Sequence, residues 1–156
     1  MSKPAAANDI IAHRKTIYPK PLADKVKVEG RARRRLGDHF GLTNFGVNLT
    51  ELAPGSSSAL AHFHTKQDEF IYILEGTPML MLGDKEYLLH PGDFCGFRAG
   101  TEVGHQLVNK SQNPVLYLEI GDRMPGDFPV YPNDDLMFTY GENGAWVMTH
   151  KNGKPY

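Results

Sequence analysis

Short runs of β-branched, aromatic and aliphatic residues alternate along the chain with breaks that are rich in glycine, proline, aspartate and asparagine. Runs of this length, ended by such breaks, predict β-strands. Between positions 42 and 120 they cover residues 42–52, 59–64, 70–74, 79–82, 87–89, 94–98, 105–109 and 115–120. No long segment carries the 3.6-residue apolar repeat of an amphipathic helix. The pattern therefore predicts an all-β sandwich or barrel.

Two flanking segments lack this strand pattern. Residues 1–41 are polar and basic, and residues 122–156 are rich in proline, glycine, aspartate and asparagine. We expect a barrel over residues 42–121 and a basic N-terminal extension, residues 1–41, that packs on the barrel or on a partner subunit. We expect residues 122–156 to form a mostly irregular C-terminal tail. Its apolar and aromatic residues would pack on the barrel, and they are Phe128, Tyr131, Leu136, Met137, Phe138 and Trp146.

The size and composition of the chain fit one compact domain. It has 156 residues, of which 40% are hydrophobic and 22% charged, and this composition is ordinary for a globular protein. Its one cysteine, Cys95, excludes an internal disulfide and a CxxC-type zinc site. No apolar run reaches the roughly 18 residues of a membrane span, and residues 1–20 lack the apolar core of a secretory signal. We therefore expect no membrane contact and a cytoplasmic location.

Charge is spread unevenly along the chain, although the net charge is only -1. Residues 1–40 hold ten lysines and arginines against four acidic residues. The densest basic run comprises Arg31, Arg33, Arg34 and Arg35. It is either an arm for nucleic acid or another anionic partner, or a segment whose charges lie against the acidic body or a second subunit. We favour the second interpretation, because no aromatic residues interleave the run to stack on bases.

The most informative residues are three histidines and one glutamate. His62 and His64 are two positions apart, so on a strand they point to the same face. The polar residues 65–68 can reverse the chain, which lets Glu69 begin the next strand beside the two imidazoles. His105 would join them from a strand that is distant in sequence. Three imidazoles and one carboxylate form a ligand set for iron, manganese, nickel or zinc that leaves coordination positions open.

A pair of histidines separated by one residue also occurs without a metal, as ordinary surface or core residues. Here His62 and His64 lie in an apolar strand, and Glu69 directly precedes the apolar run that begins at Phe70. Burying these groups without partners would be costly. A bound metal satisfies all of them together, so we favour the metal site.

These residues also fall into two motifs that resemble those of the cupin family. Residues 55–76 resemble the first cupin motif, with His-x-His, then a glutamate after four residues and a glycine after six more. Residues 92–109 resemble the second motif, in which His105 is followed after three residues by Asn109. The loop before His105 is two residues longer than the family pattern, and Arg98 stands where the family usually has proline. The resemblance covers about residues 42–121.

The resemblance implies a fold, a ligand set and a class of relatives. The fold would be all-β, a cupin-type double-stranded β-helix of the jelly-roll kind, with extensions at both ends. The metal ligands would be His62, His64, Glu69 and His105. The chain is similar to small single-domain cupins that are described as sugar-phosphate isomerases. Cupins of this size are commonly dimers, so we expect a homodimer in which the N-terminal segment reaches across.

Strand alternation also selects candidate residues for a substrate pocket. Counting from Glu69 turns Ile71 and Ile73 inward, and counting from His105 turns Leu107 and Asn109 inward. Arg98 ends a strand near the loop before His105. It is either a clamp for a substrate carboxylate or phosphate, or a surface residue at the strand end, and we favour the surface position.

Two functions from different classes follow from these residues. The first is a metal-dependent enzyme that acts on a small organic acid or sugar derivative, as an isomerase, lyase or dioxygenase. In that enzyme Glu69 would be a metal ligand and also the catalytic base. The second is a non-catalytic cupin that binds or senses a small molecule. The four-residue ligand set favours the enzyme, because open coordination positions are typical of catalytic rather than structural metal sites.

Overall fold

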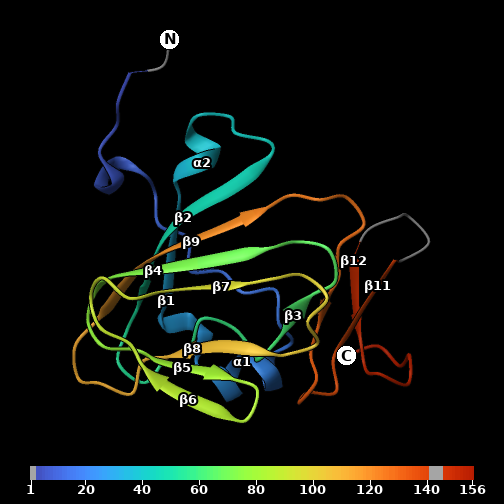
Figure 1. Cartoon of the computed structure of the whole chain (residues 1–156). Coiled ribbons are helices and arrows are strands. Elements are labelled where there is room, and N and C mark those ends of the chain that lie inside the picture. Colours follow the sequence, from blue (N-terminus) through green and yellow to red (C-terminus); the bar gives the residue numbers. More distant parts are fainter. Residues whose placement is uncertain (1–2, 141–145) are drawn as a thin grey trace.

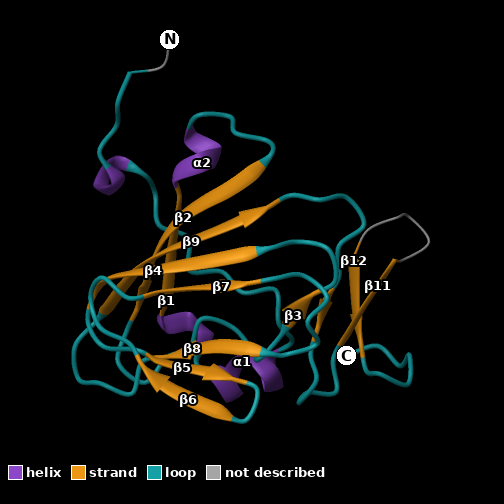
Figure 2. Cartoon of the chain, viewed as in Figure 1, coloured by secondary structure: helices purple, strands orange, loops and turns teal. Residues whose placement is uncertain are grey.

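The computed structural model describes residues 3–140 and 146–156, and strands make up most of its regular structure (Figures 1 and 2). One sheet has the order β1 (Arg31–Arg35), β2 (Phe45–Leu52), β9 (Val115–Asp122), β4 (Glu69–Glu75) and β7 (Phe94–Phe97). A second sheet has the order β6 (Lys85–Leu88), β5 (Met79–Leu82) and β8 (His105–Val108). Every pairing within these sheets is antiparallel. The all-β cupin fold expected from the sequence is confirmed.

Smaller elements complete the described chain. Strand β10 (Pro129–Val130) pairs with β3 (Phe63–His64), and β11 (Met137–Tyr140) pairs with β12 (Trp146–Thr149). The helices are α1 (Lys20–Val26) and α2 (Leu36–His39), with 3-10 turns η1 (Ala7–Asp9) and η2 (Val28–Gly30). None of the helices in the described residues is long and apolar enough to cross a membrane.

The main core lies between the two sheets, which face each other in Figure 1. Alternate residues of each strand face this core. In β4, Ile71 and Ile73 are 5% and 0% exposed, whereas Tyr72 between them is 37% exposed. Both sheets contribute to this cluster, which contains Leu52, Ile71, Ile73, Leu80, Leu107, Val115 and Tyr117. Its burial on two facing sheets stabilises the sandwich and fixes which strand faces look inward.

The two flanking segments are built into the fold. Strand β1, from the basic N-terminal extension, pairs with β2 along its whole length, from Arg31 opposite Leu52 to Arg35 opposite Asn48. Part of the tail that the sequence predicted to be irregular forms strands β10, β11 and β12. The glycine, proline and asparagine of its turns dominate its composition and hide the short strand patterns between them.

The tail packs through a second, smaller core. Tyr131 and Leu136 from the tail lie with Val26, Val28 and Leu60 in one buried cluster, and Phe138 packs against it. Met137 is 36% exposed and takes no part in this cluster. The side chain of Trp146 lies outside the described residues. The cluster holds the N-terminal segment and the tail together on the β3 side of the sandwich.

Candidate metal centre and its cavity

A cavity of about 290 Å³ opens between the two sheets. Its walls come from both sheets, from the N-terminal segment and from the tail. Residues that matter below include Arg31, Arg33, His62, His64, Glu69, His105, Tyr117, Glu119 and Tyr131. The cavity therefore joins segments from the whole length of the chain.

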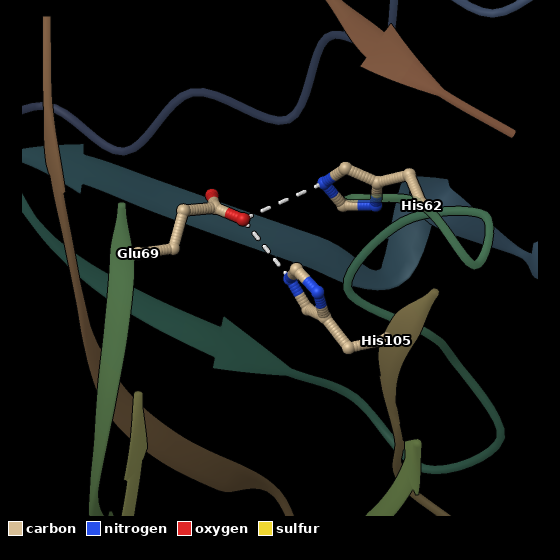
Figure 3. A group of neighbouring side chains, drawn as sticks. All are labelled: His62, Glu69 and His105. Atoms are coloured by element: carbon tan, nitrogen blue, oxygen red, sulfur yellow. Dashed lines mark ion pairs between the residues drawn. The ribbon is translucent and has the colours of Figure 1, made fainter. Parts of the chain in front are cut away.

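The three histidines and the glutamate converge on one carboxylate oxygen in this cavity. Glu69 Oε2 lies 2.9 Å from His105 Nε2, 3.8 Å from His62 Nε2 and 3.6 Å from His64 Nε2. Figure 3 shows the side chains of His62, Glu69 and His105 pointing toward one another. Their ligand atoms all lie within 4.8 Å of one another, as expected for groups that can hold one metal ion.

Backbone hydrogen bonds bring these residues together. His62 N donates to the carbonyl oxygen of His105 at 3.2 Å, and His105 N donates to that of His62 at 2.9 Å. Glu69 is the first residue of β4, so the chain reversal after β3 places it beside the histidines. Glu69 is five positions after His64, so on one continuous strand it would face the opposite way. The chain reversal over residues 65–68 instead brings it to the inner face.

Hydrogen bonds on the far side of two rings set their tautomers. His62 Nδ1 lies 2.8 Å from the carbonyl oxygen of Leu60, and His64 Nδ1 is bonded to a carboxylate oxygen of Asp127. Both acceptors require a proton on Nδ1, which leaves the Nε2 lone pair free toward Glu69. Metal-binding histidines in proteins are oriented in this way.

The protonation of the cluster suits a cation. Burial lowers the pKa of His62 to about 4, so its imidazole is neutral at pH 7. Burial of Glu69 opposes ionisation, but the approach of His105 Nε2 to 2.9 Å and the other nearby imidazoles outweigh it and lower the pKa of Glu69 to about 2. The buried Oε2 atom of Glu69 has no hydrogen bond of good geometry among the described residues. A divalent transition metal would satisfy this orphaned oxygen, so the donor set fits the metal that the sequence predicts.

Asp127 is a functional candidate that the sequence analysis missed. Besides His64, it accepts hydrogen bonds from the backbone N–H groups of Lys66 at 2.8 Å and Gln67 at 3.1 Å. These contacts lower the pKa of Asp127 despite its burial. Asp127 comes from the C-terminal tail, 63 positions from His64, so no local spacing could have indicated this pair.

Aromatic rings fix the cluster from the sides. The ring of Phe97 stacks on that of His105 with centroids 3.7 Å apart, and Tyr131 stacks on His62 with centroids 5.7 Å apart. Phe97 belongs to β7 and Tyr131 is buried in the second core, so both rings are held in place and the histidines have little freedom to turn away. The aromatic residues of the tail were expected to pack on the barrel, and Tyr131 packs directly against a candidate ligand.

The predicted pocket residues separate into two groups. Ile71 and Leu107 line the cavity. Ile73 is not among the lining residues, because it lies fully buried in the main core. Asn109 also stays outside: its Nδ2 donates to the carbonyl oxygens of Leu52 at 2.9 Å and Asn113 at 2.8 Å, which holds the turn after β8. Arg98 is exposed just beyond the end of β7 and does not line the cavity, in agreement with the surface position that we favoured.

Two arginines line the cavity instead, and they come from the basic run. The register of β1 sets Arg31 opposite Leu52 and Arg33 opposite Thr50, and both partners are buried on the inner face of the sheet. Arg33 bonds Glu119 at 3.0 Å, which matches the expectation that the run lies against acidic residues of the body. The alternation of Arg31, Ala32 and Arg33 was the signal that could have revealed an inward-facing strand.

Comparisons with known proteins agree with this architecture. Residues 48–121 match the family described as Cupin domain. A crystal structure from Silicibacter pomeroyi, described as a sugar phosphate isomerase from a cupin superfamily, is 36% identical, with a TM-score of 0.89 over 99% of this chain and 96% of that one. A protein from Acidithiobacillus ferrooxidans, described as a candidate sugar phosphate isomerase, is 31% identical, with a TM-score of 0.71 over 81% of this chain and 80% of that one.

A more distant structure shares the fold alone. The polyketide cyclase RemF from Streptomyces resistomycificus is 24% identical, with a TM-score of 0.67 over 86% of this chain and 89% of that one. No functionally curated protein matches the sequence. The domain match and the identity of 36% over nearly the whole of both chains show that this chain belongs to the cupin superfamily.

Proposed function

We propose that this cupin is a metal-dependent isomerase that acts on a small sugar derivative carrying an acid group. The observation that carries the proposal is the convergence of His62, His64 and His105 on the orphaned oxygen of Glu69 inside a cavity. The names of the proteins from Silicibacter pomeroyi and Acidithiobacillus ferrooxidans support the choice of an isomerase. The metal would be iron, manganese, nickel or zinc, and the three histidines and Glu69 would hold it.

The chemistry divides between the metal and the chain. The bound metal supplies a Lewis acid that polarises a carbonyl or hydroxyl oxygen of the substrate. Glu69 presents Oε2 to the histidines, and we assign Oε1 the task of taking a proton from a substrate carbon and returning it to the neighbouring carbon, while the hydroxyl proton passes between the two oxygens on those carbons. The rings of Phe97 and Tyr131 stack on the imidazoles of His105 and His62 and hold these two ligands in place.

Metal content tests the proposal first. The protein is purified without a histidine tag and compared with the double variant His62→Ala/His64→Ala. The control is His90→Ala, because the side chain of His90 is 62% exposed and lies outside the cavity. We expect near-stoichiometric metal in the wild type and in the control, and a loss of metal in the double variant. Equal metal content in all three proteins would refute the site.

Turnover tests the reaction class. Metal-loaded protein is incubated with a panel of aldose and ketose phosphates, and interconversion is followed by NMR. We expect isomerisation that disappears in the double variant and persists in His90→Ala. Tight binding of these compounds without turnover would refute the enzyme and favour a non-catalytic cupin that binds a small molecule.

We also propose that the chain forms a homodimer through the outer face of the larger sheet. Tyr72 and Leu74 on β4 are each 37% exposed, and Phe94 on β7 is 65% exposed. The register sets Tyr72 opposite Phe94 on one side and Leu118 on the other, which makes this face continuous and apolar. A second copy would cover it.

Light scattering at micromolar concentration checks the assembly. We expect a dimer for the wild type and a shift toward monomer for Phe94→Glu. A monomeric wild type would refute the proposal. His13 pairs with Arg33 of its own chain, so of the described N-terminal residues only 3–12 could reach across to a partner, and Figure 1 shows this segment extending past α2.

A further inference from the structure

Strand β1 sets three arginines on the inner face of the larger sheet, and they differ in their partners. Arg33 bonds Glu119 at 3.0 Å, and Arg35 lies 3.7 Å from a carboxylate oxygen of Asp38. Arg31 has no ion pair with any acidic group in the described residues, and its Nη1 donates to the carbonyl oxygen of Ser58. Of the three, Arg31 alone lacks a carboxylate.

The two carboxylates among the described residues that line the cavity are engaged elsewhere: Glu69 lies among the three imidazoles, and Glu119 bonds Arg33. The charge of Glu119 acts on Arg31, but this carboxylate is already bound to Arg33. Burial raises the pKa of Tyr117 and of Tyr131 far above the ordinary value, so both phenols are neutral. Burial and the like charge of Arg33 lower the pKa of Arg31 and outweigh the opposite effect of Glu119, so Arg31 is a desolvated cation with no ion pair among the described residues. Such a cation is costly unless an anion arrives to pair with it.

Arg31 lines the same cavity as the histidine cluster. The volume of about 290 Å³ suits a small metabolite, because it lies at the low end of the roughly 300–1,000 Å³ of ligand pockets. A planar guanidinium presents two parallel N–H groups to a phosphate or a carboxylate. One small molecule can therefore use the candidate metal site at one end and Arg31 at the other.

We propose that Arg31 binds the acid group, a phosphate or a carboxylate, of the small substrate whose other end reaches the candidate metal centre. The inference rests on the proposed function and adds what determines its specificity. Arg31 selects anionic over neutral sugars, whereas Arg33 is neutralised by Glu119 and supports the wall of the cavity. The basic run of the sequence thus recognises a small anion from inside the sandwich rather than nucleic acid from its surface.

Calorimetric binding of three probes tests this assignment. The probes are glucose 6-phosphate, gluconate and glucose, which carry a phosphate, a carboxylate and no charge. Each is titrated into wild type, Arg31→Met, Arg31→Lys and Arg35→Met, with and without added metal. Arg35→Met is the matched control, because Arg35 lies on the same face of β1 but does not line this cavity.

We expect wild type to bind at least one anionic probe roughly 10- to 100-fold more tightly than glucose, which is the range for a charged hydrogen-bonded pair. Arg31→Met should lose this preference while its weak binding of glucose stays the same. Arg31→Lys should restore part of it, and Arg35→Met should keep all of it. The preferred probe distinguishes a phosphate from a carboxylate.

Two results would overturn the inference: no preference for either anion in the wild type, or a full preference in Arg31→Met. A general loss of structure in Arg31→Met would lower the binding of glucose as well, and Arg31→Lys then decides the question through the charge that it keeps. The proposed function fails separately. If the protein takes up no metal but its anion preference still depends on Arg31, the proposal of a metal-dependent isomerase is refuted and the proposal of an anion site at Arg31 is supported.

Discussion

Two groups of side chains share the cavity of this cupin, and they differ in how complete they are. In the histidine cluster, the backbone carbonyl of Leu60 and the carboxylate of Asp127 orient two of the imidazoles. On β1, alternate side chains face the same cavity, and among them Arg31 has no ion pair with an acidic residue in the described chain. In our proposals a metal would complete the first group, and the acid group of the ligand would complete the second.

Under the proposed function, the two groups would separate recognition of the substrate from chemistry. Residues that hold a metal must be fixed within narrow geometric limits, so their hydrogen-bond partners lie within the chain. A residue that recognises a ligand keeps an unsatisfied charge, because only the ligand should satisfy it. Four substitutions test this difference between the two groups.

The largest effect is expected for Glu69→Gln. The amide keeps the shape of the side chain but removes the negative charge at the centre of the three imidazoles. We expect metal affinity to fall well beyond the roughly 10- to 100-fold that the loss of an outer partner costs. Metal titration monitored by competition with a chelator measures this, and retention of wild-type affinity would contradict the role of Glu69.

Arg33→Met removes the cation that neutralises Glu119. Both side chains are mostly buried, at 29% and 20% exposure, so the remaining carboxylate would be left without its partner. We expect a loss of about 3 kcal/mol in the free energy of unfolding, measured in urea. The double variant Arg33→Met/Glu119→Gln should recover much of it. Arg35→Met is the exposed control and should change stability by less than about 1 kcal/mol.

Asp127→Asn tests how strongly the tail supports the metal centre. The amide keeps an acceptor for His64 but loses the charge that strengthens the bond. We expect metal affinity to fall by roughly tenfold, with the fold intact by circular dichroism. Asp135→Asn is the matched control, because Asp135 also accepts from a histidine, His150 at 2.8 Å, but on the surface. An equal change of metal affinity in the two variants would show that Asp127 does not support the metal centre.

The smallest effect is expected for Arg98→Ala. Arg98 follows β7 on the surface, so its loss should leave metal content and anion preference unchanged and should alter stability by at most about 0.5 kcal/mol. The probe titrations used for Arg31 measure this directly. A loss of anion binding in Arg98→Ala would show that Arg98, rather than Arg31, recognises the anion.

Most strands of the barrel could be predicted, because a strand that covers a core repeats every two residues. The runs at residues 79–82 and 94–98 correspond closely to β5 and β7, and residues 70–74 lie within β4. The candidate ligands could also be selected, since they are polar residues in apolar runs. The same counting turned Ile73 inward correctly, but it could not say that this residue lies in the core below the cavity rather than in its wall.

The fold class and the residues of the histidine cluster could be inferred from the amino-acid sequence, because both depend on spacings of a few residues. The folded chain was needed to show that Arg31 lines the cavity and that Asp127 bonds His64. These placements depend on strand pairing and on packing between segments far apart in the chain, as in the pair of Arg31 with Leu52. The free energy that selects such a register comes from burying the inner face as a whole, and no local pattern contains it.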